Sequence, residues 1–446
     1  MSSVIVDISS YTILIFFAIY TLFGLMGLLV SNPKRQNSLL KKQRVFLFAV
    51  HFNCYIAIIA YSPLTEIAVL YVIEVVFFFF LMKIYSYFYE DGNVLLLNNM
   101  LMCMAVGFIM ITRLDFDLAI KQVIIAAVTS VILLVIPGYS SKFKYIEKGT
   151  WIYAGLGFIS LLIVFLIGTI SGGAKLSVSI FGYSFQPSEF VKILFVFFVA
   201  GILSKSTDLV HVIIATAVAA AHVLLLVMST DLGAALIFFV TYLAMLFVAT
   251  KSWIWLTLGL GSGALASVIA YKMFYHIQVR ITAWLDPLST IENEGYQISQ
   301  AMFAIGAGGW FGEGLGKGMP YKIPVVEKDF IFAAITEEFG VLFAICLVLV
   351  ALTNFLMMLN ISMQIKDKNI RLIALGLGVT YGFQMFLNIG GVTRFIPSTG
   401  VTLPLISYGG TSMVANLVVF TLIQGFYVLN NEEKKAKANA RKKRNN

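Results

Sequence analysis

The 446-residue chain contains little charge, since aspartate, glutamate, lysine and arginine together make up only 12% of it. Soluble domains average about 25% charged residues, so this composition argues against a soluble globular protein. Cysteine and histidine are scarce as well, with 3 and 4 residues. Cys54, Cys103 and Cys346 lie in apolar runs without a C-x-x-C spacing, and the histidines are scattered. The sequence therefore predicts neither a disulfide framework nor a structural metal site.

Apolar residues dominate instead, with 60% of the chain hydrophobic and a mean hydropathy of +0.92. Apolar runs of about 20 residues recur, which is the length that crosses the hydrocarbon core of a bilayer as a helix. The runs are continuous rather than alternating, which favours helices over the strands of a barrel. We predict an all-α polytopic membrane protein with about 13 transmembrane helices, near residues 9–30, 45–63, 65–84, 95–113, 118–138, 151–170, 190–204, 209–229, 231–250, 253–274, 329–359, 372–392 and 409–430.

The net charge of +9 comes from lysines and arginines in alternate short loops and in the C-terminal tail. Membrane topology alone produces this distribution, so nucleic acid is not a predicted partner. Basic loops stay cytoplasmic, which predicts the N-terminus outside and the tail inside. No basic residue precedes the first apolar run, so we expect no cleavable signal peptide. The outward loops are then those around 171–189, 229–231, 275–328 and 393–408.

Glycines and charged residues gather in the outward segment Gly295–Gly340, unlike the rest of the chain. Its GEGLGKG stretch fails the G-x-x-x-x-G-K-[ST] pattern of a phosphate loop and follows no predicted strand. We therefore exclude a nucleotide site. Glycine allows close backbone approach and unusual dihedral angles, so we expect this loop to fold back against the helix bundle.

Two outward helix starts carry ionisable residues. In the stretch FQPSEFVKI, Glu189 and Lys192 are three residues apart and share a helix face. They form either a structural ion pair on a helix capped by Ser188, or part of a cavity wall. Asp231 opens the next such helix, where it either caps the helix or contributes charge to the same cavity.

Asp329 stands where the chain enters another apolar run, close in sequence to Lys322, Glu327 and Lys328. Asp329 is either a structural N-cap of the following helix or a general base that acts on a substrate hydroxyl. Further along the same run, Glu337 and Glu338 need partners or water.

The last polar stretch is Asn388–Ser412, which is rich in glycine and proline. Irregular backbone at membrane depth is tolerated where it lines a cavity, so Arg394 and the SYGGTS segment are expected near Asp329. These patterns predict an outward polar cavity in a helix bundle. They leave open an enzyme acting on a lipid-borne substrate, a transporter and a scaffold.

The motifs together resemble the SEDS family (shape, elongation, division and sporulation), whose members include FtsW, RodA and SpoVE. The resemblance covers roughly residues 95–429 and rests on many matches in one order. They are ITRLDFDLAIKQ, GAK at Gly173–Lys175, QPSEFVK, TDLGAAL, WLDP, GYQISQAMFAIGAGGWFGEGLGKG, IPVVEKDFIFAAITEEFG and IPSTGVTLPLISYGGTS. The chain departs from the family at Ser229–Thr230, where Gln-Pro is common, and at Lys328, where threonine is common.

The resemblance implies a ten-helix core at 91–430, preceded by a three-helix membrane extension at 1–90 and followed by a basic cytoplasmic tail at 431–446. It also implies a peptidoglycan glycosyltransferase of the bacterial cytoplasmic membrane, acting in division, elongation or sporulation. Such an enzyme polymerises lipid II at the outer face, beside a class B penicillin-binding protein and other cell-wall machinery. A lipid II flippase and a non-catalytic scaffold are the alternatives.

The resemblance also assigns roles to residues. Asp329 is expected to be the catalytic base, with Arg280, Lys322 and Lys192 as candidates for the pyrophosphate. Glu189 and Asp231 are expected to shape or charge the cavity. The remaining expected substrate-binding residues are Gln186, Ser188, Ser407 and Tyr408. A divalent metal, Mg²⁺ or Mn²⁺, is expected by family resemblance and on charge grounds, although the sequence itself indicates no metal ligands.

Overall fold

The computed structural model describes residues 2–62, 64–89, 92–136, 143, 145–171, 174–180 and 183–445. Gly173 of the GAK motif lies outside the described residues. Twelve of the described helices are long and apolar enough to cross a membrane, which confirms an all-α polytopic membrane fold. They are α1 (Ser2–Leu29), α2 (Pro33–Tyr61), α3 (Thr65–Phe88), α4 (Val94–Leu114), α5 (Phe116–Leu133), α6 (Thr150–Ile167), α8 (Leu209–Met228), α9 (Leu232–Thr250), α10 (Trp253–Met273), α14 (Val341–Gln364), α15 (Lys368–Val392) and α16 (Gly410–Asn445).

The remaining predicted span, at 190–204, is α7 (Ser188–Lys205). It is 18 residues long and carries three charged residues, Glu189, Lys192 and Lys205, whereas each of the twelve contains a stretch of that length with at most two. Packing against α6, α9 and α15 buries α7 near the middle of the bundle, and Lys192 and Glu189 form an ion pair there.

The expected single span at 329–359 is divided in two, which corrects the sequence prediction. A short helix, α13 (Ile331–Phe339), ends at Gly340, and α14 begins directly after it. Gly340 has φ 85°, and a Cβ there would lie 2.5 Å from the amide nitrogen of Gly312. A residue with a side chain would be strained and obstructed at this point, so glycine permits the break.

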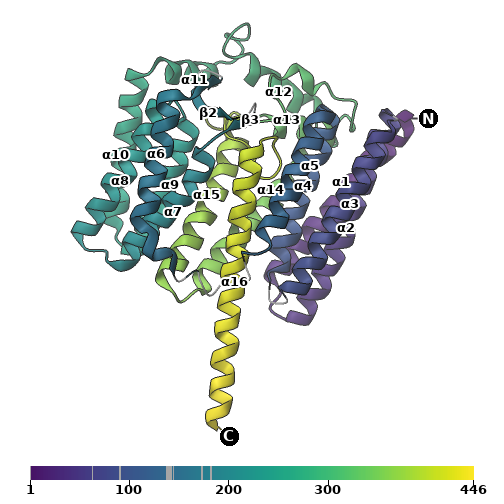
Figure 1. Ribbon diagram of the computed structural model, residues 1–446. Helices are drawn as coiled ribbons and strands as arrows, with labels where there is room; N and C mark the ends of the chain where they lie inside the picture. Colours follow the sequence, from purple (N-terminus) through teal and green to yellow (C-terminus); the bar gives the residue numbers. More distant parts are fainter. Residues whose placement is uncertain are drawn as a thin grey trace.

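The segments between the long helices also contain regular structure. The loop near 171–189 holds a small antiparallel sheet of β1 (Thr169–Ser171), β2 (Ala174–Ile180) and β3 (Tyr183–Phe185), in the order β1-β2-β3. The 275–328 segment forms α11 (Tyr275–Leu285) and α12 (Tyr296–Gly308). Figure 1 shows β2, β3, α11, α12 and α13 at one end of the bundle, which is also the end where the N-terminus lies; the C-terminus lies beyond the opposite end.

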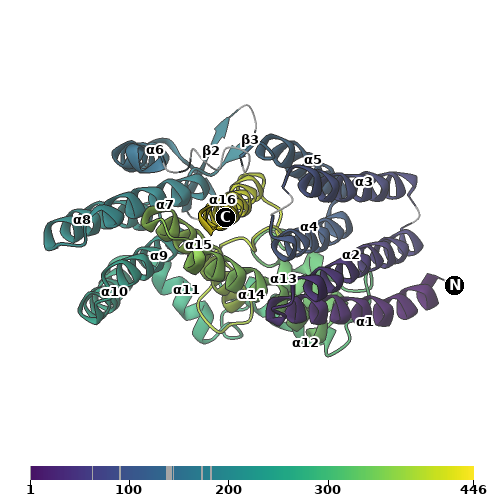
Figure 2. The same cartoon turned by 90° about the horizontal axis from the view of Figure 1, so that it is seen from below.

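Seen along the bundle, α1, α2 and α3 form a group on one side, and α6, α8 and α10 lie on the other (Figure 2). Between them lies the core, in which α4 is buried along almost its whole length. Asn98 and Asn99 of α4 are fully buried and hydrogen-bonded, although the Nδ2 of Asn99 has no partner among the described residues. Asn98 donates to Gln43 Oε1 at 2.9 Å, and Asn99 accepts from Gln43 Nε2 at 3.1 Å. These bonds explain how an otherwise apolar helix carries two amides.

Candidate active site

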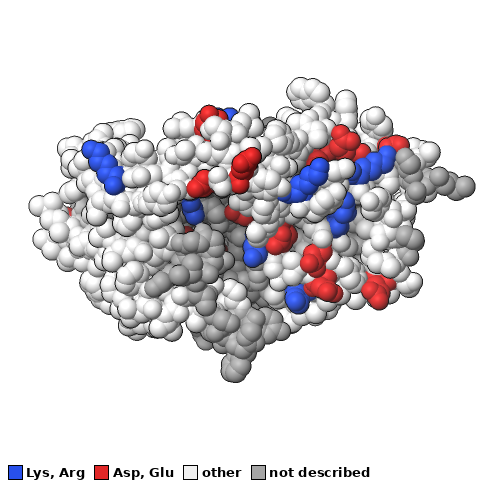
Figure 3. Space-filling view, turned by 90° about the horizontal axis from the view of Figure 1, so that it is seen from above, with Lys and Arg blue, Asp and Glu red and all other residues white. Residues whose placement is uncertain are grey.

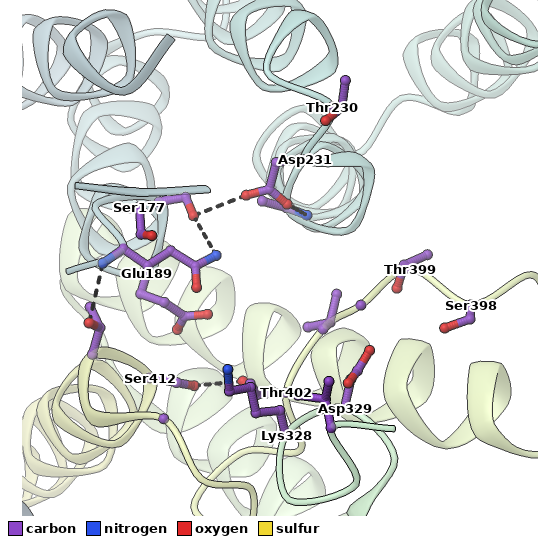
Figure 4. A pocket seen from close by; sticks show the side chains of 18 of the residues that line it. Ser177, Glu189, Thr230, Asp231, Lys328, Asp329, Ser398, Thr399, Thr402 and Ser412 are labelled. Atoms are coloured by element: carbon purple, nitrogen blue, oxygen red, sulfur yellow. Dashed lines mark hydrogen bonds between the residues drawn. The ribbon is translucent and has the colours of Figure 1, made fainter. Parts of the chain in front are cut away.

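A cavity of about 590 Å³ opens where the outward-predicted segments meet. The beginnings of α7 and α9 form one side, α11 and the turn before α13 form the other, and the 398–412 segment closes the base. In Figure 3, charged side chains gather around a hollow on this face. Figure 4 shows Glu189 and Asp231 lying across the cavity from Asp329.

The structure brings together eight of the ten residues singled out from the sequence. The residues that line the cavity are Gln186, Ser188, Glu189, Lys192, Asp231, Arg280, Asp329 and Tyr408. Lys322 is exposed on a short 3₁₀ turn and is not among the lining residues. Ser407 is buried, and its hydroxyl accepts from the Leu403 amide at 2.8 Å, so it stabilises a turn beneath the cavity.

The start of α7 places an ion pair in the cavity wall. Lys192 Nζ donates to Glu189 Oε2 and to Gln384 Oε1, both at 2.6 Å, and all three residues are buried. The two interpretations of this pair therefore both apply: it is a structural ion pair, and it lines the cavity. The expected Ser188 cap is wrong, because α7 has Pro187 at its N-cap and no side-chain cap bond.

Asp231 caps α9 and faces the cavity at the same time. Its Oδ1 accepts from the Ala234 amide at 3.1 Å, which confirms the capping interpretation. Its Oδ2 accepts from the Ser188 hydroxyl at 3.1 Å, which joins the starts of α7 and α9. Burial raises the pKa of Asp231. The preceding Thr230 has φ 62°. Proline cannot adopt this angle, so the backbone here differs from that of SEDS proteins with proline at this position.

Asp329 does not cap the following helix, so that interpretation is wrong. Helix α13 begins at Ile331, and its N-cap, Phe330, makes no side-chain cap bond. The backbone of Asp329 is fixed instead by Asn388, whose Nδ2 donates to the Asp329 carbonyl at 2.8 Å and to the Val401 carbonyl at 2.6 Å. The carboxylate is thus left for the cavity, and its Oδ2 lies 3.8 Å from the position of a Cβ built on Gly400.

The electrostatic surroundings of Asp329 combine opposing influences. Burial raises the pKa of its carboxyl from 3.8 to about 6, while the charges of Lys328 and Arg280 lower it. A carboxyl that titrates near neutral pH is suited to general acid–base chemistry, and such groups concentrate at functional sites.

Arg280, on α11, is the best-placed cation for an anionic ligand. Burial lowers the pKa of Arg280, and the charges of Asp231 and Asp329 oppose that shift, so the guanidinium lies within the field of two carboxylates. Its Nη1 is buried and has no hydrogen-bond partner among the described residues. A buried guanidinium nitrogen without a partner is costly, and an anion entering the cavity would supply that partner.

Two amides of α15, Gln384 and Asn388, bond to residues that line the cavity, and neither was assigned a role from the sequence. Gln384 Nε2 donates to the Thr402 carbonyl at 3.1 Å, and the Thr402 and Ser412 hydroxyls are 2.8 Å apart. Gln384 and Asn388 are four residues apart on an apolar helix, and this spacing could have indicated an inward polar face. Arg394, expected here, instead donates to the carbonyls of Trp284 and Leu285 at 2.8 and 2.6 Å.

The glycine-rich segment folds back against the bundle, as predicted. The amides of Glu313 and Gly314 donate to the carbonyls of Glu337 and Glu338 at 2.9 and 3.0 Å. The two glutamates also gain side-chain partners: Glu337 Oε1 accepts from the Met319 amide at 2.8 Å, and Glu338 Oε1 accepts from Arg113 Nε at 3.1 Å. The loop therefore wraps the end of α13, the helix that follows Asp329.

The cavity does not fit a metal ion held by protein ligands alone. No group of three histidine, cysteine, aspartate or glutamate side chains is placed to hold a metal among the described residues. Both oxygens of Asp231 already accept hydrogen bonds, and Glu189 is paired with Lys192. Magnesium, however, is often held by one or two carboxylates together with substrate phosphates.

The sequence matches one family of known proteins and several of its members. The sequence profile of the cell cycle protein family of FtsW, RodA and SpoVE matches residues 92–430. The peptidoglycan glycosyltransferase RodA of Mycobacterium tuberculosis is 34% identical over 278 residues, which cover 56% of this chain and 57% of that protein. The chain thus spans little more than half the length of this relative. The probable peptidoglycan glycosyltransferase FtsW of Aliivibrio salmonicida is 33% identical over 300 residues, covering 64% of this chain and 75% of the relative.

Two solved structures share the fold. The rod shape determining protein RodA of Thermus thermophilus matches with a TM-score of 0.57 and 22% identity, over 75% of this chain and 96% of that one. A chain from a peptidoglycan synthase complex that coordinates polymerization and crosslinking matches with a TM-score of 0.63 and 22% identity, over 76% of this chain and 98% of that one.

Proposed function

Since the chain belongs to the cell cycle protein family of FtsW, RodA and SpoVE, we propose that it is a peptidoglycan glycosyltransferase that polymerises lipid II. The observation that carries the proposal is one cavity containing a carboxyl with a raised pKa, Asp329, and a guanidinium, Arg280, with one buried nitrogen that has no partner among the described residues. Glycosyl transfer to a hydroxyl, with pyrophosphate as leaving group, needs a base and a cation of this kind.

In the proposed reaction, the ionised carboxylate of Asp329 accepts the proton of the acceptor sugar hydroxyl. The hydroxyl oxygen forms a bond to the anomeric carbon of the donor sugar as the bond from that carbon to the pyrophosphate oxygen breaks. The pyrophosphate leaves with the electron pair, and its growing negative charge is stabilised by the Arg280 guanidinium. Each cycle thus lengthens a glycan strand and releases a lipid-linked pyrophosphate.

The other cations singled out from the sequence are less suited to the leaving group. Lys192 is engaged by Glu189 and Gln384, and Lys322 is not among the residues that line the cavity. Lys328 does line the cavity, is exposed and directly precedes Asp329. We therefore assign the pyrophosphate to Arg280 and Lys328, and assign Lys192 a structural role.

The divalent ion expected from the family resemblance, Mg²⁺ or Mn²⁺, would be held mainly by the pyrophosphate of the substrate. Protein carboxylates would contribute only one or two ligands, because no larger set is available among the described residues. Such an ion would neutralise charge on the leaving group. The proton transfer assigned to Asp329 does not depend on it.

The cavity lies at the end of the bundle opposite the basic tail, which supports an orientation with the active site outside the bacterial cytoplasmic membrane. Lipid II and a class B penicillin-binding protein are the proposed substrate and partner, and other cell-wall machinery would assemble with them. The partner proposal is supported by the likeness to a chain from a peptidoglycan synthase complex.

A pH profile tests the base assignment. Because burial raises the pKa of Asp329 to about 6, and a base must be ionised, kcat/KM is expected to rise through about pH 6 and then level off. The Arg280→Ala change removes a cation that lowers this pKa, so the rising limb should move to higher pH. Polymerisation of labelled lipid II from pH 5 to pH 8 measures both. A limb that stays in place in Arg280→Ala would argue that another group titrates.

The proposed orientation has its own test by cysteine labelling in intact cells. Trp310→Cys places a thiol on an exposed position of the glycine-rich loop, and Lys437→Cys places one in the exposed tail. A membrane-impermeant maleimide should label position 310 in intact cells and position 437 only after permeabilisation. The unsubstituted chain, in which Cys54 and Cys103 are buried and Cys346 is half-buried, is the control for background labelling. The opposite labelling pattern would reverse the topology.

A further inference from the structure

The three helices α1, α2 and α3 lie before residue 92, where the family match begins. They are joined to the core by buried polar contacts rather than by apolar packing alone. Besides the amides of α4 described above, a buried network reaches the core from α2. Within the three helices, His51 of α2 lies 2.7 Å from Glu74 of α3, and Tyr55 of α2 donates to Glu74 at 2.7 Å. The Tyr55 hydroxyl is also 3.2 Å from the Thr112 hydroxyl of α4.

These three helices form the N-terminal unit, and two of them, α1 and α2, also touch the glycine-rich loop directly. Asp7 of α1 forms an ion pair with Lys317. A Cβ built on Gly314 would lie 3.1 Å from Val6 and 3.2 Å from Ser10, so the loop backbone rests on the surface of α1. Tyr11 lies one turn after Asp7 on α1, and its ring is 6.0 Å from the ring of Phe311 in the loop.

A second contact comes from the end of α2. The Tyr61 ring lies beneath Gly316, where a built Cβ would approach it to 3.0 Å, and Gly316 has φ 91°. The guanidinium of Arg113 stands over the same ring at 5.5 Å. Arg113 donates to the Gly316 carbonyl at 3.2 Å and pairs with Glu338 of α13. Tyr61 therefore supports the arginine that joins the loop to α13.

An aromatic stack forms a third connection, through the bundle. Phe17 of α1 stacks on Phe343 of α14 with ring centroids 4.2 Å apart, and Phe343 stacks on Phe339 at 4.4 Å. Phe339 is the last residue of α13. The N-terminal unit thus reaches the C-terminal end of α13 both through the loop and through α14.

We propose that the N-terminal unit is a built-in clamp on the glycine-rich loop, and that through the loop it positions α13 and the Asp329 carboxylate that precedes it. The loop backbone is bonded to the end of α13, and its glycines leave it few side chains with which to hold itself. The contacts with α1 and α2 supply that support from outside the family core. The structural role of the clamp is inferred from these contacts alone. Its expected effect on the rate of turnover rests on the proposed function.

The test uses the full-length chain in lipid nanodiscs. The triple variant Asp7→Ala/Tyr11→Ala/Tyr61→Ala removes the side chains that touch the loop and leaves the cavity residues intact. Amide hydrogen exchange over residues 309–319 is expected to become about tenfold faster, the size expected for losing two aromatic contacts and a surface ion pair. In the lipid II assay kcat should fall several-fold while KM stays unchanged, because positioning rather than binding is affected.

Glu66→Ala is the matched control, since Glu66 is an exposed carboxylate in the first turn of α3 and is not one of the residues that contact the loop in the three connections above. Reversing the charges of the ion pair gives a second test that keeps the fold intact. Asp7→Lys should speed amide hydrogen exchange in the loop, and Asp7→Lys combined with Lys317→Asp should return that exchange to the wild-type rate. Restoration supports the clamp. Unchanged loop exchange in the triple variant overturns the clamp, whatever reaction the protein catalyses. Faster exchange with unchanged kcat overturns the positioning role and leaves the proposed function standing.

Discussion

Asp329→Asn is expected to reduce lipid II polymerisation by at least about a hundredfold, since general base catalysis contributes roughly 10²–10⁴ in rate. Asparagine has nearly the same shape, but it cannot accept the proton of the acceptor hydroxyl. The Asn388 bond that holds this residue goes to its backbone carbonyl, so the local fold should survive. The initial rate of glycan synthesis by the purified variant measures the effect.

The matched control for this variant is Asp286→Asn. Asp286 ends α11 in the same outward segment, is exposed, and is not among the residues that line the cavity. The control should polymerise lipid II at the wild-type rate. Wild-type activity in Asp329→Asn would remove the base assignment, and loss of folded protein in that variant would show that the carboxylate is needed for stability rather than chemistry.

Lys192→Met is expected to destabilise the protein by about 3–5 kcal/mol, the usual cost of removing one partner from a buried ion pair. The Lys192 and Glu189 side chains are only 5% and 10% exposed, so the change leaves Glu189 without a counter-charge in a poorly solvated place. Gln384 loses a partner as well. A lower midpoint of thermal unfolding in detergent measures the loss.

Two further variants separate charge from side-chain packing. Lys205→Met removes a lysine from the exposed far end of the same helix and should leave the midpoint unchanged. Glu189→Gln combined with Lys192→Met removes both charges and should recover part of the stability. If Lys192→Met unfolds at the wild-type temperature, the pair contributes little to the fold, and Lys192 returns as a candidate for the pyrophosphate.

The sequence predicted the membrane fold well because apolar length is a strong signal. Each predicted span corresponds to a long helix, apart from the region at 329–359, where a single glycine allows α13 to end before α14. The break depends on how closely Gly340 approaches the backbone of Gly312, a tertiary contact between residues 28 apart. Hydropathy alone does not carry this information.

The cavity was predictable in part. Ionisable residues at membrane boundaries identified Glu189, Asp231 and Asp329, and the structure gathers all three around one cavity. Local roles were harder to predict, because Ser188 and Asp329 both stand near helix starts where a cap is the usual interpretation. The Ser188 hydroxyl bonds to Asp231 instead, and the Asp329 carboxylate faces the cavity. A position near a helix start does not determine which partner a side chain takes.

The residues that were missed sit inside helices. Gln384 and Asn388 hold Lys192 and the backbone of Asp329, yet they are isolated amides in an apolar segment. Their importance emerges from α15 packing beside α7 and α13, which brings distant stretches of chain together. Arg394 shows the reverse case, since it looked like a cavity residue but binds carbonyls at the end of α11.

The transporter and scaffold alternatives lead to different products. A flippase would move lipid II across the bilayer without joining sugars, and a scaffold would do neither. Asp329 and Arg280, the proposed base and cation, line one cavity at one end of the bundle rather than a path through it. This arrangement favours an enzyme over a transporter. Product analysis therefore separates the three functions.

The most direct measurement is polymerisation of fluorescent lipid II by the full-length chain in proteoliposomes, with its proposed penicillin-binding partner, Mg²⁺ or Mn²⁺ present and lipid II translocation followed in parallel. We predict glycan strands from the wild-type chain and from Asp286→Asn, none from Asp329→Asn, and no translocation from any of them. Translocation without glycan strands, or equal polymerisation by the wild-type chain and Asp329→Asn, would contradict this prediction.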